Sequence, residues 1–181
     1  MSLPNILTLI RIGLIPVIII ALLIDDALAR WTAIALFAIA AITDYLDGYF
    51  ARKFNIISSL GRMLDPIADK LLVGALLIAL AYNGSFTLPL LGAAIAIMMR
   101  EIAVAGLREF LGGQQIVVNV TPVAKYKTTS QLIALGAIML VPLVNGLAPF
   151  AAALMWLATA LTVYSGYDYF ASAWPHLKEK S

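Results

Sequence analysis

Four aspartates lie close together in the first half of the chain, and their spacing suits metal-assisted chemistry. Asp44 and Asp47 are three positions apart, and Asp65 and Asp69 are four apart, so each pair lies on one face of a helix. Four uncompensated carboxylates would repel one another and would be costly to remove from water. Two divalent cations would cancel the four formal charges, and oxygen ligands favour Mg²⁺ or Mn²⁺ over zinc. Because protein-bound Mg²⁺ commonly also binds substrate phosphates, the acids predict a phosphate-bearing substrate.

Two helices joined by a short connection must position these acids. Residues 31–52 keep helical spacing through the first acidic pair, residues 66–82 form the next apolar segment, and the connection 53–60 is short. A short connection predicts antiparallel neighbours, which would bring the four carboxylates together. An alternative is that Asp44 or Asp47 pairs with Arg52 and that this ion pair holds two helices together. That alternative explains one or two of the acids but not four.

The composition places these helices in a membrane. Hydrophobic residues make up 62% of the chain, charged residues only 12%, and the mean hydropathy is +0.97. Soluble domains have about 45–50% apolar and about 25% charged residues. A chain of 181 residues has too little interior to bury such an excess. We therefore expect an all-α integral membrane protein, one membrane domain over residues 1–181, with six transmembrane helices and a short interfacial N-terminal segment. The uncharged stretch 128–167 is divided in two by Pro142, Asn145-Gly146 and Pro149.

Charge and cysteine content exclude several classes of function. The net charge of +2 is too balanced to indicate nucleic-acid binding, and the absence of cysteine excludes disulfides and thiolate metal sites. The first five residues lack a cationic leader, so we expect no removable signal. Most lysines and arginines fall on one side of the six predicted spans. The positive-inside rule therefore predicts that both termini and the acids face the cytoplasm.

A second set of charged residues lies beyond the acidic helices. Arg100 and Arg108 are eight residues apart and can share a broad helix face, and Lys125 and Lys127 follow on the same predicted side. A phosphate-bearing acceptor needs such cations, and arginine binds phosphate oxygens bidentately. The alternative is that these charges only set the topology or extend toward the interface. Glu101 could hold one of the arginines in place.

Small and polar residues suggest where a bulky substrate group would lie. Asn5, Thr8 and Arg11 recur every three residues, so they could close a nucleotide site or simply form one face of an interfacial helix. Three small residues lie near the acids in the sequence: Gly48, Ala51 and Gly61. They would leave room for a bulky substrate group against the helix backbone. The alternative is that they only let membrane helices pack closely.

The acidic region matches a known signature. Residues 44–69 fit Asp-x2-Asp-Gly-x2-Ala-Arg-x8-Gly-x3-Asp-x3-Asp at every fixed position, and in this the chain resembles the CDP-alcohol phosphatidyltransferases. Outside the motif, four segments are similar to the bacterial branch of that family that makes phosphatidylglycerophosphate: Leu3–Arg11, Arg100–Glu109, Lys125–Thr128 and Ser165–Phe170.

The resemblance implies a six-helix enzyme of the inner membrane, usually a homodimer, with its site open to the cytoplasmic leaflet. It implies transfer of the phosphatidyl group from CDP-diacylglycerol to sn-glycerol 3-phosphate, giving phosphatidylglycerophosphate and CMP. The sequence itself favours direct displacement, because it shows no cysteine and no well-placed pair of nucleophile and base. By the same analogy Asp44, Asp47 and Asp65 hold two metal ions, and Asp69 is both a ligand and the general base. The residues that would accommodate the cytidine diphosphate are Gly48, Ala51, Arg52 and Gly61, with Asn5 and Thr8 as further candidates.

Three other functions remain open at this point. A sister transferase would use another acceptor, such as inositol phosphate, serine or phosphatidylglycerol. Membrane aromatic prenyltransferases also use aspartate-rich motifs and Mg²⁺, but they resemble longer chains with more spans. An ion-conducting protein would carry acids near the middle of the bilayer on several helices, whereas these acids cluster at the predicted cytoplasmic ends of two helices.

Overall fold

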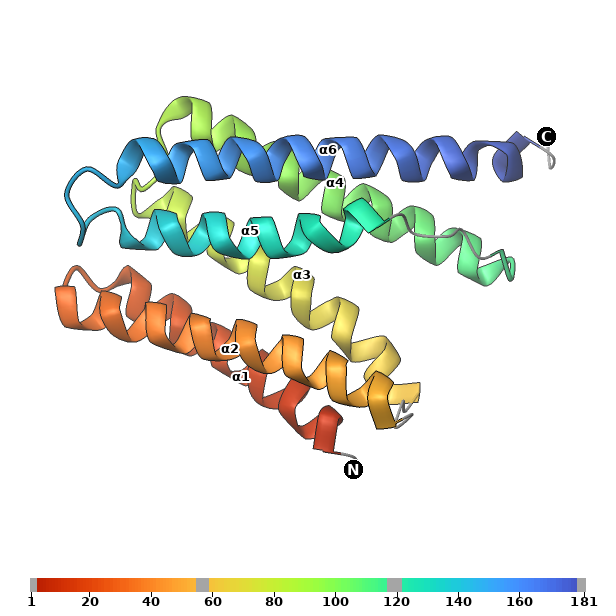
Figure 1. The fold of residues 1–181 in the computed structure, drawn as a ribbon, viewed down its shortest axis with the longest axis horizontal. Coiled ribbons are helices and arrows are strands. Elements are labelled where there is room, and N and C mark those ends of the chain that lie inside the picture. The colour runs from red at the N-terminus through yellow and green to blue at the C-terminus, as the bar shows by residue number, and fades with distance from the viewer. Residues whose placement is uncertain (1–2, 55–58, 117–121, 179–181) are drawn as a thin grey trace. The chain divides into compact units, whose positions relative to one another are not determined.

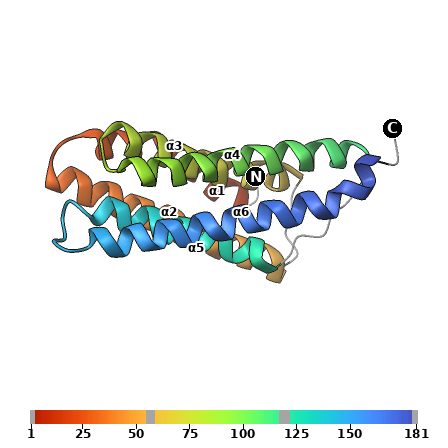
Figure 2. The same ribbon diagram turned by 90° about the horizontal axis from the view of Figure 1, so that it is seen from above.

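The computed structural model describes residues 3–54, 59–116 and 122–178, with side chains for 5–44, 61, 63–64, 66–116 and 126–177. Within these ranges every regular element is an α-helix, which confirms the all-α expectation (Figures 1 and 2). The six helices are α1 (Leu3–Leu23), α2 (Ala27–Phe54), α3 (Ser59–Tyr82), α4 (Leu88–Gly113), α5 (Pro122–Leu140) and α6 (Ala148–Lys178).

In the part of the chain that the structure describes, four of these helices are long and apolar enough to cross a membrane. Their qualifying stretches are Asn5–Leu23, Ala27–Asp44, Leu88–Gly113 and Ala148–Leu177. In hydrocarbon every backbone polar group must be bonded internally, which a helix achieves and an irregular segment does not. Membrane spans by α3 and α5 stay a prediction, because both helices carry charged residues in their first halves.

Helix boundaries agree with most of the breaks expected from the sequence. The Asn83-Gly84-Ser85 turn follows α3; Gly84 has φ +72°, and Asn83 Oδ1 accepts a hydrogen bond from Ser85 N at 3.1 Å. Gly146, at φ +80°, lies between α5 and α6 and divides the long uncharged stretch as expected. The N-terminal segment is not a separate element, because residues from Leu3 onward form the first turns of α1.

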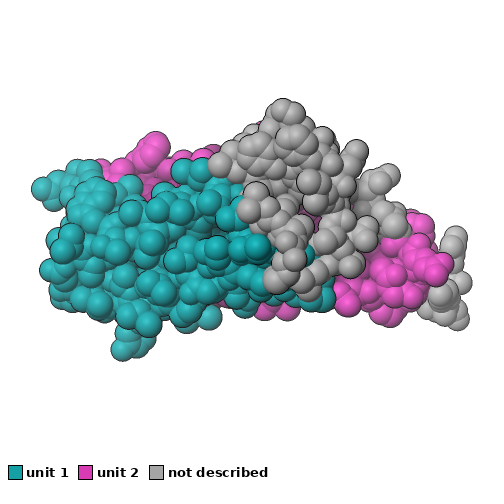
Figure 3. Space-filling model, turned by 90° about the horizontal axis from the view of Figure 1, so that it is seen from below, with its two compact units in different colours: residues 1–85, 138–145 teal, residues 86–137, 146–181 magenta. Residues whose placement is uncertain are grey.

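The helices form two compact units (Figure 3). Unit 1 comprises residues 1–85 and 138–145, and unit 2 comprises residues 86–137 and 146–181. The acidic motif lies in unit 1, and the second set of charged residues lies in unit 2. A single membrane domain over residues 1–181 stays a prediction.

In unit 1, α1 packs against both α2 and α3. Side chains of α1 spaced by three or four residues face this contact, as expected for a helix with one buried face. The buried face is apolar in the second half of α1, at Ile15, Ile18 and Leu22, and polar in the first half, at Asn5, Thr8 and Arg11. One helix therefore supplies both an apolar anchor and a polar surface to its two neighbours.

In unit 2, α4 packs against α6. The buried residues of α4 include Ile97 and Val104, and those of α6 include Met155 and Ala158. Farther along α6 the buried face becomes polar, with Thr162 and Ser165 less than 3% exposed. The buried face of α6 thus combines apolar and polar residues, as that of α1 does.

Candidate active site

The acidic group of unit 1 consists of Asp44, Asp69 and Arg11. Arg11, on α1, forms an ion pair with Asp44 of α2, and its Nη1 lies 3.8 Å from Oδ1 of Asp69 on α3. The arginine side chain is 2% exposed, whereas those of Asp44 and Asp69 are 30% and 42% exposed. Carboxylates from two helices therefore converge on one buried guanidinium, with part of each carboxylate still accessible.

The other two aspartates of the motif lie on the same helices. Asp47 is within α2, one turn after Asp44, and Asp65 is within α3, one turn before Asp69. Their side chains fall outside the described part of the structure, as do those of Gly48, Ala51 and Arg52. Among the described side chains alone, no group of three or more acids, histidines or cysteines is assembled. The full metal-ligand set predicted from the sequence therefore stays a prediction.

Three residues proposed for the nucleotide are described, and all are buried. Asn5 and Thr8 are 5% and 1% exposed and share the inward face of α1 with Arg11. Gly61, in the first turns of α3, is also buried. These side chains are therefore buried within unit 1, and their role at a nucleotide site stays a prediction.

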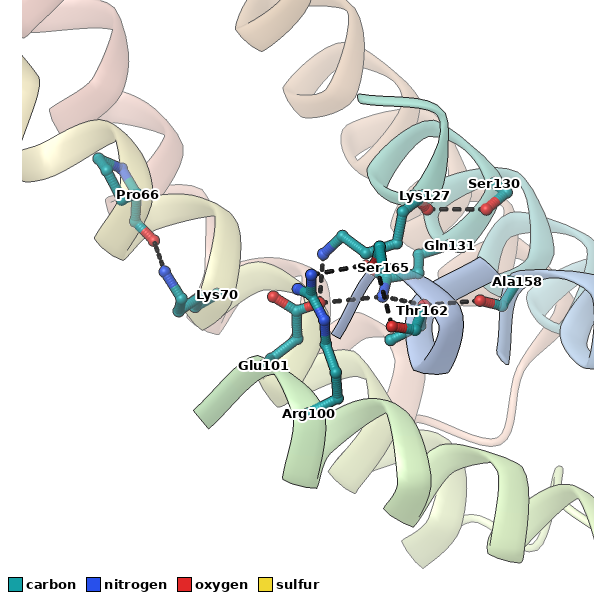
Figure 4. A network of polar contacts seen from close by, with 10 residues as sticks. All are labelled: Pro66, Lys70, Arg100, Glu101, Lys127, Ser130, Gln131, Ala158, Thr162 and Ser165. Carbon is teal, nitrogen blue, oxygen red and sulfur yellow. Dashed lines mark hydrogen bonds and ion pairs between the residues drawn. The ribbon is translucent and has the colours of Figure 1, made fainter. Parts of the chain in front are cut away.

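The basic group of unit 2 consists of Arg100 and Glu101 of α4 and Lys127 and Gln131 of α5. A single oxygen, Glu101 Oε1, accepts hydrogen bonds from Arg100 Nη1 at 3.1 Å and from Gln131 Nε2 at 3.2 Å, and it also pairs with Lys127 Nζ. Figure 4 shows these side chains pointing toward one another from their separate helices. Glu101, 13% exposed, thus joins two cations.

Helix α6 completes this network. Gln131 Nε2 donates to Thr162 Oγ1 at 2.8 Å, and Arg100 Nη2 donates to Ser165 Oγ at 3.0 Å (Figure 4). Ser165 Oγ in turn donates to the carbonyl oxygen of Thr162 at 3.0 Å. Three helices are therefore tied together by bonds that converge on Glu101 and Arg100.

The other two residues predicted to bind the acceptor phosphate, Arg108 and Lys125, lie on the same two helices, α4 and α5. The guanidinium carbon of Arg108 lies 5.7 Å from the centroid of the Tyr169 ring on α6, within the range of a cation–π contact. Arg100 and Arg108 therefore both contact α6, which agrees with the prediction that they share one face of their helix. Lys125 lies in the first turn of α5, and its side chain is outside the described part.

Sequence reasoning missed the α6 partners and the amide of Gln131. Their signal was present, because Gln131, Thr162 and Ser165 are polar residues inside a long uncharged apolar stretch. Polar side chains in a membrane helix usually bond across to a neighbouring helix. Lys127 was read as a phosphate ligand or a topology charge, whereas it is 5% exposed and paired with Glu101.

The two groups carry opposite surplus charge. Two carboxylates and one guanidinium leave the described acidic group with a formal charge of −1, and one carboxylate with two cations leaves the basic group with +1. The first arrangement favours a bound cation, and the second favours a bound anion.

Comparison with known proteins identifies the family. The sequence model of the CDP-alcohol phosphatidyltransferases matches residues 1–164. The CDP-diacylglycerol–glycerol-3-phosphate 3-phosphatidyltransferase of Rickettsia felis is 43% identical, with 93% of each chain covered. The proteins of that name from Bacillus subtilis and Cereibacter sphaeroides are 42% and 37% identical and cover 98% and 99% of this chain, and 97% and 98% of their own lengths. The protein belongs to the CDP-alcohol phosphatidyltransferase family.

Proposed function

We propose that the protein transfers the phosphatidyl group of CDP-diacylglycerol to sn-glycerol 3-phosphate, giving phosphatidylglycerophosphate and CMP. The observation that carries this proposal is the extent of the match to relatives named for that reaction. Two of them are 43% and 42% identical over 93% and 98% of the chain. The chain also retains every fixed position of the acidic motif.

In this reaction an acceptor oxygen bonds to the phosphorus of the phosphatidyl group, and the bond from that phosphorus to the CMP oxygen breaks. An alcohol becomes an effective nucleophile when a positioned carboxylate accepts its proton. We assign this role to Asp69. Asp44 forms the closer ion pair with Arg11, while the Asp69 side chain is the more exposed of the two, at 42% against 30%. Direct displacement is favoured because the sequence shows neither a cysteine nor a well-placed pair of nucleophile and base that would form a covalent intermediate.

Members of the family generally depend on divalent cations. The donor set fits such an ion, since Asp44 and Asp69 bring carboxylate oxygens from two helices to the same guanidinium. We infer that Asp44, Asp47, Asp65 and Asp69 together hold two ions, Mg²⁺ or Mn²⁺. When bound, these ions would neutralise the diphosphate and ease the departure of CMP.

We assign the nucleotide to the residues that flank the acids. Asn5, Thr8 and Gly61 are buried within unit 1, and the first two lie on the same face of α1 as Arg11. The small residues Gly48 and Ala51, with Arg52, follow directly after the first acidic pair in α2. The burial of the described members and their closeness to the acids support this assignment.

We assign the acceptor phosphate to Arg100, Arg108 and Lys125. The acceptor is an anion, so it needs cations separate from the acids, which would repel it. The surplus positive charge of the basic group supports this assignment. Glu101 and Ser165 hold Arg100 at two of its nitrogens, which would keep a planar guanidinium in a fixed orientation.

The reaction is tested by incubating detergent-purified protein with CDP-diacylglycerol and one labelled acceptor at a time. We expect CMP release and a phosphatidyl product with sn-glycerol 3-phosphate, lost on chelation and restored by Mg²⁺ or Mn²⁺. Parallel reactions contain inositol phosphate, serine or phosphatidylglycerol. A product with one of these and none with glycerol 3-phosphate would instead identify a sister transferase.

We also infer a multi-pass homodimer in the inner membrane, with the acids facing the cytoplasm. The family resemblance and the placement of basic residues support this inference. Single cysteines at the exposed Thr87 and Asn145 should react with an impermeant thiol reagent from outside the cell, and a cysteine at Gly113 should not. The turn glycines are poor sites for the probe because their positive φ disfavours other residues. The reverse labelling pattern would contradict the orientation.

A further inference from the structure

The side chain of Arg100 lies against the backbone of α6 at Gly166. A Cβ atom built at this glycine would lie 2.8 Å from Cγ and 3.2 Å from Nε of Arg100. Among the glycines whose surroundings the structure describes, Gly166 is the only one with any atom within 4 Å of such a Cβ. Gly166 is therefore the described glycine at which a methyl group would displace a functional side chain.

The contact involves the stem of the arginine, close to its Cα, and this limits how the side chain can adapt. A clash at the far end of a flexible side chain is relieved by a small rotation. A clash at Cγ requires a different χ1 rotamer, or a movement of α4 away from α6. Either change would carry the guanidinium away from its two hydrogen-bond acceptors, Glu101 Oε1 and Ser165 Oγ.

Ser165 supplies the second constraint on the same guanidinium. Its hydroxyl donates to the carbonyl oxygen of Thr162, so its lone pairs are directed at Arg100 Nη2, 3.0 Å away. Gly166 thus gives room for the stem of Arg100, and the preceding residue holds the tip. Both residues are buried in α6.

A glycine in a helix interior carries a penalty of about 1 kcal/mol relative to alanine. Close packing of α4 on α6 alone would explain the glycine, since small residues let membrane helices approach. That role would affect stability and all substrates equally. A role in holding Arg100 would affect chiefly the substrate that Arg100 binds.

We propose that Gly166, together with Ser165, is a positioning residue that fixes the guanidinium of Arg100 for the phosphate of the acceptor. This inference rests on the proposed function, in which Arg100 contacts that phosphate. It adds the backbone of α6 at Gly166 as a determinant of acceptor affinity.

The test compares Gly166→Ala with Gly92→Ala, which adds the same methyl group to α4 at an exposed position with nothing within 4 Å. We expect Gly166→Ala to raise the KM for sn-glycerol 3-phosphate roughly 10- to 100-fold, because misplacement by about 1 Å has effects of this size. The KM for CDP-diacylglycerol should stay unchanged. Gly92→Ala should change both KM values by less than about twofold.

A double-mutant cycle separates positioning from packing. Alanine at position 100 has no Cγ, so Gly166→Ala should change the acceptor KM by less than about twofold in an Arg100→Ala background. A full additional loss in that background would overturn the proposal. If Gly166→Ala does not yield folded protein, Ser165→Ala decides, with an expected two- to tenfold rise in acceptor KM. No rise with Ser165→Ala would then overturn the proposal.

The same data distinguish this inference from the proposed function. If Arg100→Ala leaves the acceptor KM unchanged, the assignment of Arg100 to the acceptor phosphate is wrong. If Arg100→Ala raises it and Gly166→Ala does not, only the positioning proposal is wrong.

Discussion

The two polar groups have inverse charge arrangements. In the acidic group one buried arginine lies between two carboxylates, and in the basic group one glutamate accepts from an arginine and a lysine. Each group draws its members from more than one helix of its own unit. The central residue in each case holds together helices that would otherwise carry like charges into the same region.

The difference lies in the charge that each central residue leaves uncancelled. A buried charge must be paired, but pairing two carboxylates with one guanidinium satisfies the interior while still leaving a negative surplus. In the basic group the same arrangement leaves a positive surplus. The proposed reaction joins a diphosphate-bearing donor to an anionic acceptor, and it needs both kinds of surface.

The largest expected effect is a loss of turnover when the acidic group is changed. Replacing Asp69 by asparagine removes the proposed base while keeping a similar shape, so kcat should fall roughly 100- to 10,000-fold. Binding of CMP, measured by equilibrium dialysis, should be kept better than in Asp44→Asn. Asp25→Asn, at an exposed position between α1 and α2, is the matched control and should retain activity. Near-normal turnover of purified Asp69→Asn protein would refute the assignment of the base.

In the basic group, the main expected effect of a substitution is a loss of protein stability. Glu101→Gln removes the shared acceptor charge and leaves Arg100 and Lys127 uncompensated, which should lower stability by about 3–5 kcal/mol. Thermal unfolding in detergent measures this, with the exposed Glu109→Gln as the control. Combining Glu101→Gln with Lys127→Met should destabilise less than the sum of the two single changes. Strict additivity would show that the two residues do not depend on each other.

The sequence was sufficient for the parts governed by spacing. Helical periodicity and turn residues predicted the breaks at Gly84 and Gly146, and the separation of Arg100 and Arg108 predicted that they share one face of α4. These features depend on local geometry, which one segment of the chain determines by itself.

Partners across helices were harder to predict. Nothing local distinguishes Lys127, which pairs with Glu101, from a lysine that only marks the cytoplasmic side. Arg11 was grouped with Asn5 and Thr8 by spacing, but its ion pair with Asp44 depends on how α1 packs against α2. Gly166 lies in a segment that resembles the family, but its role could not be predicted, because the need for a glycine there comes from a side chain on another helix.

A moderate effect on acceptor KM should show whether the basic residues bind the acceptor or only set the membrane topology. Arg108→Ala removes one proposed charge-assisted hydrogen bond, worth about 1.5–3 kcal/mol, so the KM for sn-glycerol 3-phosphate should rise roughly 10- to 150-fold. The KM for CDP-diacylglycerol should stay nearly constant, and Lys125→Ala should behave alike. Arg30→Ala, at a basic residue in the first turn of α2, is the control. If both KM values rise together, the basic residues serve the nucleotide or the fold instead.

The smallest effect concerns the Tyr169 ring beside Arg108. Tyr169 is 6% exposed, and its ring centroid lies 5.7 Å from the guanidinium carbon, so a cation–π contact restrains an otherwise exposed arginine. Such contacts contribute about 0.5–1 kcal/mol, so Tyr169→Leu should raise the acceptor KM about two- to fivefold. Tyr169→Phe keeps the ring and should leave this KM unchanged. In an Arg108→Ala background Tyr169→Leu should have no further effect on acceptor KM, because the cation it restrains is gone. An equal rise with phenylalanine and leucine would instead assign the effect to the tyrosine hydroxyl.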